Sequence, residues 1–459
     1  MKTFLLCALA TVAIACTQAA AQTLTEHSLG HVKVTGPATG PRLFSPSGDN
    51  MAVREKVGER ERYVTLSGAG ELFDELGPGA SWVQGRIVYY GRIGKRFYLV
   101  DGTSKLPIDG KPTSPTGSAR PWLSRDRTHY AAFSSDGRKV SWYQDRKKKA
   151  QTFDRLALLL VNGGAGVPAF VAYKKCQLVV AGLPSVANEE WDMIDSVYAD
   201  VTGKEALIYG KKASLPYLKR NGKTIFREAI QGLYTGGSLA DWYAIVERPI
   251  EDQPSMTLIK NGEAISTADV DSTRQLFHLS PNGLAWAWYI LDEDYVGVTI
   301  RHSHGKEIHV SQIPLGFTFS DDGSRHAYFL RSADAATIHP VIDGQAQSIA
   351  SVAVKSGSFA FGPNGAYAYV PVKDGKESVV THLGTGPWFD SISQVLFLPD
   401  GTPAYAASNS DGRFIVVGEK VLNAPVDDLH FVSTLRLAGS TIEVMGTRGN
   451  EVVAISVKN

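Results

Sequence analysis

The chain has 459 residues, of which 43% are hydrophobic, 20% charged and 10% aromatic, and its formal net charge is +1. This is the composition of an ordinary globular protein, and it excludes a disordered tail, a coiled coil and a collagen. A neutral charge balance gives no electrostatic basis for binding nucleic acid, because that binding depends on neutralising phosphates.

Residues 1–21 have the pattern of an export signal. A positive start at Met1–Lys2 precedes the apolar run 3–15, and Ala19–Ala21 supplies the small residues that a signal peptidase cleaves after. The run is too short to cross a bilayer, and no later stretch has 18 uncharged apolar residues, so we predict a periplasmic or secreted protein without a transmembrane segment. The alternative is a lipid anchor at Cys16, which follows Ala13-Ile14-Ala15.

Three cysteines occur, and two of them, Cys7 and Cys16, fall within or at the edge of the signal. Cys176 opens the apolar run Cys-Gln-Leu-Val-Val, which predicts a buried thiol on a strand. The exported chain is therefore expected to fold without disulfides, through burial and hydrogen bonding. Nothing in the sequence points to a cofactor.

A turn motif repeats along the chain. It consists of an apolar residue, a short polar or proline-containing stretch and a glycine, and it precedes an aromatic strand-like run. The copies are Phe44-Ser-Pro-Ser-Gly48, Phe133-Ser-Ser-Asp-Gly137, Leu279-Ser-Pro-Asn-Gly283, Phe319-Ser-Asp-Asp-Gly323, Phe361-Gly-Pro-Asn-Gly365 and Phe397-Leu-Pro-Asp-Gly401. The last four glycines are 40, 42 and 36 residues apart.

A second turn ends apolar runs in Asn-Gly or Asp-Gly, the dipeptides that favour a tight type I′ hairpin. These runs end at Gly102, Gly163, Gly222, Gly262 and Gly344. The two turns together predict four antiparallel strands in each unit of about 40 residues, which is the blade of a β-propeller.

Ten candidate units span residues 40–459, and weak turns in three of them leave eight or nine as alternatives. They begin near residues 40, 76, 127, 191, 231, 268, 312, 351, 391 and 426. The final unit ends one strand short, so residues 22–39, with a strand at His31–Thr35, are predicted to complete it and close a single ring. Two tandem propellers are the alternative.

The repeated Phe-Ser-Pro/Asp-Asp/Asn-Gly turn followed by Ala-Tyr or Ala-Trp resembles the WD40-like repeats of TolB-type propellers. The resemblance covers most of residues 40–458. It implies an all-β propeller of the bacterial envelope whose partner is another envelope protein.

Common catalytic motifs are missing from the sequence. It contains no Gly-x-Ser-x-Gly elbow, no His-Glu-x-x-His and no phosphate-binding glycine loop. We therefore favour a non-catalytic protein-binding scaffold. The alternatives are a glycan or small-molecule binder and an enzyme whose site lies on the channel axis.

Two segments are too long for ordinary blade connections, and function concentrates in such loops. Residues 111–127 and 173–191 are therefore predicted to contact the partner, through the residues Trp122, Arg125, Lys174, Lys175 and Trp191. Trp388 is expected to be a further surface aromatic residue.

Three other clusters contain residue types that can form a binding site. The basic run Arg146–Lys149 could contact an acidic partner or a lipid headgroup, but four like charges on one hairpin tip favour a simply solvated surface. His302 and His304, with His309 nearby, suggest a metal site, but Gly305 favours an exposed turn. The acidic runs 292–294 and 321–322 lack the spacing of a calcium loop. No metal ligand is predicted.

Overall fold

The computed structural model describes residues 23–40, 42–47, 49–114, 119–124, 126–157, 161–163, 168–186, 189–200, 202–236, 239–250, 253–269, 276–291, 297–305, 307–332, 336–347, 351, 353–429 and 435–458. The regular secondary structure of this part of the chain is β-strand apart from two short 3-10 turns, η1 (Pro184–Val186) and η2 (Pro363–Gly365). None of the helices in the described ranges is long and apolar enough to cross a membrane. The predicted signal and Cys16 lie outside the described residues.

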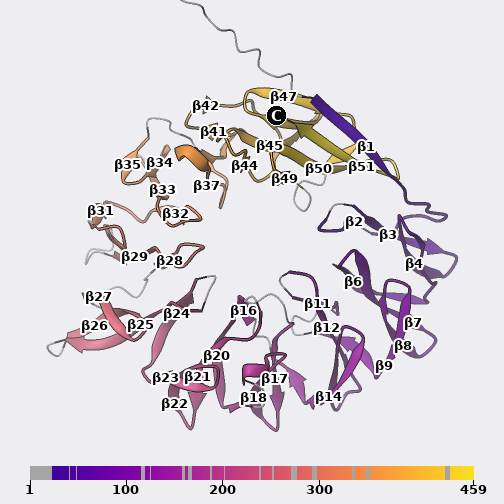
Figure 1. The fold of residues 1–459 in the computed structure, drawn as a ribbon, viewed down its shortest axis with the longest axis horizontal. Coiled ribbons are helices and arrows are strands. Elements are labelled where there is room, and N and C mark those ends of the chain that lie inside the picture. The colour runs from indigo at the N-terminus through magenta and orange to yellow at the C-terminus, as the bar shows by residue number, and fades with distance from the viewer. Residues whose placement is uncertain are drawn as a thin grey trace, which may run out of the picture.

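The described strands form twelve hydrogen-bonded sheets, two of which are the two parts of one interrupted blade. This arrangement gives eleven blades, numbered here in chain order. Figure 1 shows the blades following one another around one centre, with early strands such as β2, β28 and β32 innermost. The all-β propeller predicted from the turns is confirmed.

Blades 1 to 4 occupy the first part of the chain. Blade 1 contains β2 (Leu43–Phe44), β3 (Met51–Val57), β4 (Arg60–Thr65) and β5 (Gly68–Ala69). Blade 2 contains β6 (Glu75–Val83), β7 (Arg86–Ile93), β8 (Arg96–Asp101) and β9 (Ser104–Ile108). Blade 3 contains β10 (Lys111–Thr113), β11 (Trp122–Leu123), β12 (Tyr130–Ser135), β13 (Val140–Gln144) and β14 (Lys147–Phe153). Blade 4 contains β15 (Arg155–Leu156), β17 (Phe170–Lys174), β18 (Gln177–Ala181) and β19 (Glu190–Trp191).

Blades 5 to 8 follow. Blade 5 contains β20 (Met193–Ala199), β21 (Ala206–Lys212), β22 (Leu215–Arg220), β23 (Lys223–Phe226) and, parallel to β20, β16 (Val161–Gly163). Blade 6 contains β24 (Ile230–Thr235), β25 (Trp242–Ile250), β26 (Gln253–Lys260) and β27 (Glu263–Asp269). Blade 7 contains β28 (Leu276–Leu279), β29 (Trp286–Leu291), β30 (Val298–His302) and β31 (Ile308–Val310). Blade 8 contains β32 (Leu315–Phe319), β33 (His326–Arg331), β34 (Ile338–Ile342) and β35 (Gln345–Ala346).

Blades 9 to 11 complete the ring. Blade 9 contains two short sheets, one of β36 (Ala353–Val354), β39 (Pro371–Lys373) and β40 (Lys376–Glu377), the other of β37 (Ala360–Phe361), β38 (Tyr367–Tyr369), β41 (Val380–Thr381) and β42 (Gly384–Thr385). Blade 10 contains β43 (Ser391–Ile392), β44 (Leu396–Phe397), β45 (Pro403–Asn409), β46 (Gly412–Val417) and β47 (Lys420–Ala424). Blade 11 contains β48 (Asp428–Leu429), β49 (Arg436–Ala438), β50 (Thr441–Arg448), β51 (Glu451–Lys458) and β1 (Thr23–His31).

In blades 7 and 8 the turn between the first two strands is held by a serine clamp. In blade 8 the Ser320 hydroxyl donates to the Asp322 carboxylate at 2.6 Å and accepts the backbone N–H of Arg325 at 3.0 Å. Blade 7 repeats this pattern with Ser280 and Asn282. These local bonds fix the turn without help from the rest of the fold, which explains why the motif is visible in the sequence.

The turn between the third and fourth strands also matches the prediction in blades 5, 6 and 8. Asn221, Asn261 and Asp343 have φ values of 50°, 51° and 49°, and a glycine follows each of them. The Asn261 Oδ1 atom accepts the backbone N–H of Trp242 at 3.0 Å, so the turn is joined to the second strand of its blade. Positive φ is the conformation that asparagine, aspartate and glycine adopt most readily.

Apolar residues between neighbouring blades form the core. Among the described residues there are eleven such clusters, each shared by two successive blades. Trp142 of blade 3 contacts Phe170 of blade 4 with ring centroids 5.1 Å apart, and Phe329 of blade 8 contacts Tyr369 of blade 9 at 5.5 Å. Burying each such side chain contributes about 1.5–3 kcal/mol.

The ring of contacts returns to its start. One cluster joins Met51 and Val53 of blade 1 to Met445 and Val452 of blade 11. The strand β1 pairs antiparallel with β51, with His27 opposite Ala454, so the N-terminal strand completes the last blade as predicted. The position of that strand was predicted wrongly, because it occupies Thr23–His31 rather than His31–Thr35.

The blade count was also predicted wrongly, because residues 155–191 form a blade of their own. Its first strand has only two residues, and the sequence 157–169, between its first two strands, contains no serine. Asn162-Gly163, predicted as a hairpin turn, lies in β16 beside blade 5. Gly137, predicted in the first turn of a unit, lies between the second and third strands of blade 3, and the first turn there is clamped by Ser124 and Asp126.

Candidate functional site

The two segments predicted as partner-binding loops contain blade strands: β10 and β11 lie in residues 111–127, and the end of β17 with β18 and β19 lies in residues 173–191. Trp122 is half-buried in β11, and Arg125 lies outside the described residues. Lys174 is half-buried at the end of β17, and Lys175 is exposed in the turn to β18. Whether these residues bind a partner stays a prediction.

Trp191 was expected at the surface and is instead completely buried. It pairs opposite Leu178 of β18 and packs in the cluster between blades 4 and 5. The ammonium of Lys219 lies 5.2 Å from the centre of its ring. A fully buried side chain offers no surface to a partner, so this part of the prediction is wrong.

Cys176 is exposed rather than buried in a strand. It forms the turn between β17 and β18 together with Lys175, and φ is 50° at Lys175 and 68° at Cys176. The carboxylate of Asp154 accepts the N–H of Lys175 at 2.7 Å and holds this turn in place. The apolar strand therefore begins one residue later than predicted.

The basic run is largely engaged with blade 2 and with its own blade. Arg146 Nε lies 3.4 Å from Asp101 Oδ2, and Lys148 forms an ion pair with Asp109. Lys149 lies 5.7 Å from the centre of the Trp142 ring. Three of these four cations thus stabilise the hairpin and its neighbour instead of forming an unoccupied cationic patch.

A groove with exposed apolar side chains lies between blades 9 and 10. Its volume is about 270 Å³, and its lining includes Leu383, Pro387 and Tyr405. Leu383 is 72% exposed, and Trp388, which follows Pro387, is 39% exposed. Trp388 is therefore the surface aromatic residue that the sequence predicted. A larger cavity of about 560 Å³ lies between blades 8 and 9.

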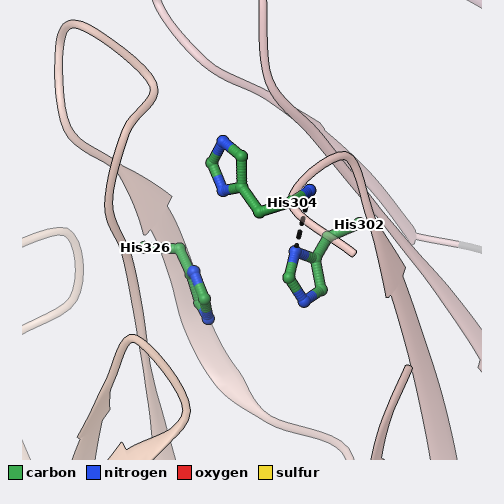
Figure 2. A group of neighbouring side chains, drawn as sticks. All are labelled: His302, His304 and His326. Carbon is green, nitrogen blue, oxygen red and sulfur yellow. Dashed lines mark hydrogen bonds between the residues drawn. The ribbon is translucent and has the colours of Figure 1, made fainter. Parts of the chain in front are cut away.

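Three histidines come together at the junction of blades 7 and 8. His302 ends β30, His304 lies in the turn that follows, and His326 begins β33 of the next blade. Their donor nitrogens all lie within 4.8 Å of one another, and this is the one such cluster of histidine, cysteine or acidic residues in the described ranges. Figure 2 shows His326 facing His302 and His304 from the neighbouring strand.

His326 is the buried member of this three-histidine cluster, with 6% of its surface exposed. Its ring stacks on Phe317, with centroids 5.6 Å apart and planes 8° from parallel. Burial and the nearby His302 and His304 lower the pKa of His326 to about 4, although Asp343 opposes this shift, so the ring is neutral near pH 7. Its Nε2 atom has no hydrogen-bond partner among the described residues, which costs about 1–3 kcal/mol.

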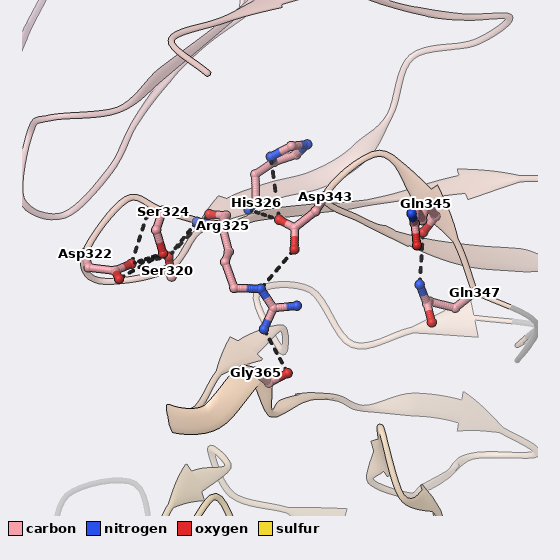
Figure 3. A network of polar contacts seen from close by, with 9 residues as sticks. All are labelled: Ser320, Asp322, Ser324, Arg325, His326, Asp343, Gln345, Gln347 and Gly365. Carbon is pink, nitrogen blue, oxygen red and sulfur yellow. Dashed lines mark hydrogen bonds and ion pairs between the residues drawn. The ribbon is translucent and has the colours of Figure 1, made fainter. Parts of the chain in front are cut away.

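A polar network fixes the other side of the His326 ring. Asp343 Oδ1 accepts the backbone N–H of His326 at 2.9 Å and lies 3.8 Å from its Nδ1. Arg325 binds Asp343 Oδ2 at 2.9 Å and donates to the carbonyl of Gly365 in blade 9 at 2.8 Å, as Figure 3 shows. The network therefore orients the ring so that Nδ1 faces a carboxylate.

The two more exposed members of the cluster, His302 and His304, are held together by a hydrogen bond within the turn that follows β30. The backbone N–H of His304 donates to Nδ1 of His302 at 3.3 Å, and the ring centroids of His302 and His326 are 5.1 Å apart. His309, which the sequence placed near this pair, bonds instead to Thr299 and stands outside the cluster. The sequence identified His302 and His304, but missed His326 because it belongs to another blade.

No family model matches the chain, and no curated protein matches it in sequence. Solved structures with some similarity include a eukaryotic initiation factor, with 11% identity, a TM-score of 0.37 and coverage of 70% of this chain and 89% of that one. Sqt1 of Saccharomyces cerevisiae has 11% identity, a TM-score of 0.30 and coverage of 74% and 95%. The Dos1 propeller has 9% identity, a TM-score of 0.30 and coverage of 73% and 90%. With TM-scores this low, the propeller assignment rests on the blades and their shared cores.

Proposed function

We propose that this protein is an exported, non-catalytic scaffold that binds another envelope protein in the groove between blades 9 and 10. The single observation that carries the binding site is the exposure of two large apolar side chains, Leu383 and Trp388, beside this groove. Apolar side chains grouped at a concave surface are typical of a protein interface, in which aromatic anchors supply much of the binding energy.

The groove is built on ordered parts of the fold. The floor residue Tyr405 is buried on β45 and belongs to the cluster that joins blades 9 and 10. Val379 belongs to the same cluster and lines the groove as well. A partner that meets such a preformed surface loses little binding energy to ordering the scaffold. This supports a binding role.

The export part of the proposal rests on the sequence. The charged start, the apolar run and the small residues before Gln22 are the support for export, and the TolB-like turn motif is the support for an envelope partner. Cleavage after Ala21 predicts Gln22 as the first residue of the mature protein, whereas a lipid anchor predicts a modified Cys16.

The test is crosslinking in intact cells, followed by isolation of the protein and mass spectrometry. The double variant Leu383→Ala/Trp388→Ala is expected to lose the crosslinked partner that the wild-type protein retains, because both side chains are exposed and contribute little to folding. Leu215→Ala is the matched control, since Leu215 is 59% exposed on blade 5. An unchanged set of partners in the double variant would contradict the proposed groove, and protein retained in the cytoplasm would contradict export.

A further inference from the structure

We propose that His302, His304 and His326 bind one divalent transition-metal ion of the zinc type, with a fourth coordination position open to water or to an atom of a bound molecule. The proposal concerns the junction of blades 7 and 8 and does not depend on the partner groove between blades 9 and 10. It rests on the convergence of the rings, on the surroundings of His326 and on the way this junction departs from the rest of the repeat.

The donor atoms are already close to the spacing of a metal site. A tetrahedral zinc ion with Zn–N distances of about 2.0–2.1 Å holds its ligand nitrogens roughly 3.4 Å apart. The three histidines place theirs within 4.8 Å without an ion. His302 is half-buried and His304 is exposed, so small rotations of these two side chains toward the fixed His326 ring close the remaining gap.

The surroundings of His326 match those of a metal ligand. Metal-binding histidines commonly direct their second ring nitrogen to a carboxylate, which fixes the ring and strengthens the ligand. In His326 the Nδ1 atom lies 3.8 Å from Asp343, which is itself held by Arg325, while the buried Nε2 atom is left without a hydrogen-bond partner among the described residues. A buried, oriented and unsatisfied nitrogen needs a partner, and a metal ion would supply it.

The turn that carries His304 departs from the repeat. Ser303 donates its N–H to the carbonyl of Trp286, as Asp343 does to His326 in blade 8. This equivalence places His304 of blade 7 where blade 8 has a glycine, Gly344. Asn221 and Asn261 make the same bond in blades 5 and 6, which aligns His304 with two more glycines, Gly222 and Gly262.

The same alignment shows what stands at the His326 position elsewhere. The bonds pair it with Trp286 in blade 7, Trp242 in blade 6 and Ala206 in blade 5, all of which are apolar. The propeller fold therefore requires neither a histidine in the turn nor one at the start of the second strand. His304 and His326 both differ from the residues at these positions in the other blades, and they lie close together. This favours a role in binding a ligand over a role in folding.

The donor set also selects the class of metal. Imidazole nitrogens suit zinc, copper, nickel and cobalt, whereas calcium and magnesium prefer oxygen ligands. No acidic residue belongs to the cluster formed by the described residues. We therefore expect Zn²⁺ and Co²⁺ to bind, and expect Ca²⁺ and Mg²⁺ not to compete.

The experiment measures metal bound to the whole mature chain. Because Cys176 is an exposed thiol that can itself bind zinc, every protein carries Cys176→Ser. After removal of metal and equilibrium dialysis with Zn²⁺, the expected result is one tightly bound ion per chain, and Co²⁺ should give the strong visible absorption of four-coordinate cobalt. His304→Ala, in an exposed turn, and His326→Gln should each weaken binding by more than the roughly 10–100-fold that loss of an outer partner costs.

Two control variants distinguish loss of a metal ligand from loss of any exposed histidine and from loss of a positioning residue. His309→Ala removes an exposed histidine of the same blade and should leave Zn²⁺ binding unchanged. Asp343→Asn removes a positioning residue and should weaken binding by roughly 10–100-fold while keeping one ion per chain. The proposal is overturned if the parent protein binds no Zn²⁺, if Co²⁺ gives no four-coordinate spectrum, or if His304→Ala binds as well as His309→Ala.

Discussion

Glu55 is a fully buried carboxylate at the point where the segment after β1 meets blade 1. Its Oε2 atom accepts the N–H groups of Thr35 and Gly36 at 2.7 and 3.0 Å, and Arg62 Nε lies 2.5 Å from its Oε1. Burial alone raises the pKa of Glu55, but these bonds outweigh it and hold the pKa below its usual value. The charged form therefore stabilises the fold at neutral pH.

Replacing Glu55 with glutamine is expected to lower the free energy of unfolding by about 2 kcal/mol at pH 7, because the bonds lose their charge assistance. A carboxyl group whose pKa is lower in the folded than in the unfolded protein stabilises the fold at pH values above its unfolded-state pKa. This stabilisation is lost as the pH falls through its folded-state pKa. The difference between wild-type protein and variant should therefore shrink in acid. Urea unfolding at pH 7 and at pH 4 measures both effects.

Glu59→Gln is the matched control, since Glu59 is an exposed glutamate in the adjacent turn between β3 and β4. It is expected to change the free energy of unfolding by less than about 0.5 kcal/mol at either pH. A Glu55 variant as stable as this control would show that the carboxylate does not anchor the N-terminal segment.

Residues that act through contacts between blades were the hardest to predict from sequence. His302 and His304 stand out as a pair, but His326 is separated from them by more than a strand and is brought close only by packing of blade 8 on blade 7. Trp191 shows the reverse error, because its place in a segment predicted as a long connection suggested a surface position, whereas it lies on β19 and is buried between blades. The position of His326 and the burial of Trp191 both depend on packing between blades, which the local sequence does not show.

Among the structural elements, the tight turns could be predicted from the sequence, because their conformation depends on the residues within the turn itself. Asn261 combines a φ of 51° with a bond from the Trp242 N–H to its Oδ1 and a bond from its Nδ2 to Asp241 at 2.7 Å. Replacing it with alanine removes both bonds and places an ordinary residue in the left-handed region, where the cost is about 1–2 kcal/mol. We expect Asn261→Ala to unfold at a lower urea concentration than the wild-type protein.

Asn261→Gly separates the two causes of that loss. Glycine adopts positive φ without strain but cannot make the side-chain bonds, so this variant is expected to lose roughly 0.5–1.5 kcal/mol, the value of a net hydrogen bond. Urea unfolding of both variants orders them as wild type, glycine and alanine. If alanine were as stable as the wild type, the backbone conformation of this turn would not matter to the blade.

Elements without such turns were missed for the same reason. Blade 4 has a two-residue first strand, and residues 182–189, between its third and fourth strands, contain no Asn-Gly or Asp-Gly. Its strands are held by the core that they share with blades 3 and 5. The contacts that define this blade therefore leave no local sequence pattern, and residues 173–191 within it were predicted as a long connection.

For the whole molecule, the sequence predicted the propeller architecture correctly but not the number of blades. A period of about 40 residues with two turns in each unit is sufficient to indicate a propeller. The number of blades is set by how many sheets pack side by side before the first meets the last, and that closure depends on the contact of Met51 and Val53 with Met445 and Val452. Packing of this kind leaves no local pattern.

Closure can be tested through the pairing of β1 with β51. His27 and Ala454 are direct partners, and directly opposed residues in antiparallel strands have Cα atoms about 4.5–5.5 Å apart, within the range of a disulfide. In a Cys176→Ser background, the pair His27→Cys/Ala454→Cys should form a disulfide that raises the melting temperature, because it closes a loop spanning nearly the whole ring and so stabilises by about 4–5 kcal/mol. Reduction should remove the gain.

His27→Cys/Ser456→Cys is the control, since Ser456 lies opposite Thr25 and two residues out of register. Equal crosslinking of the two pairs would mean that β1 slides along β51, and absence of crosslinking in both would mean that the N-terminal strand does not complete blade 11 in solution.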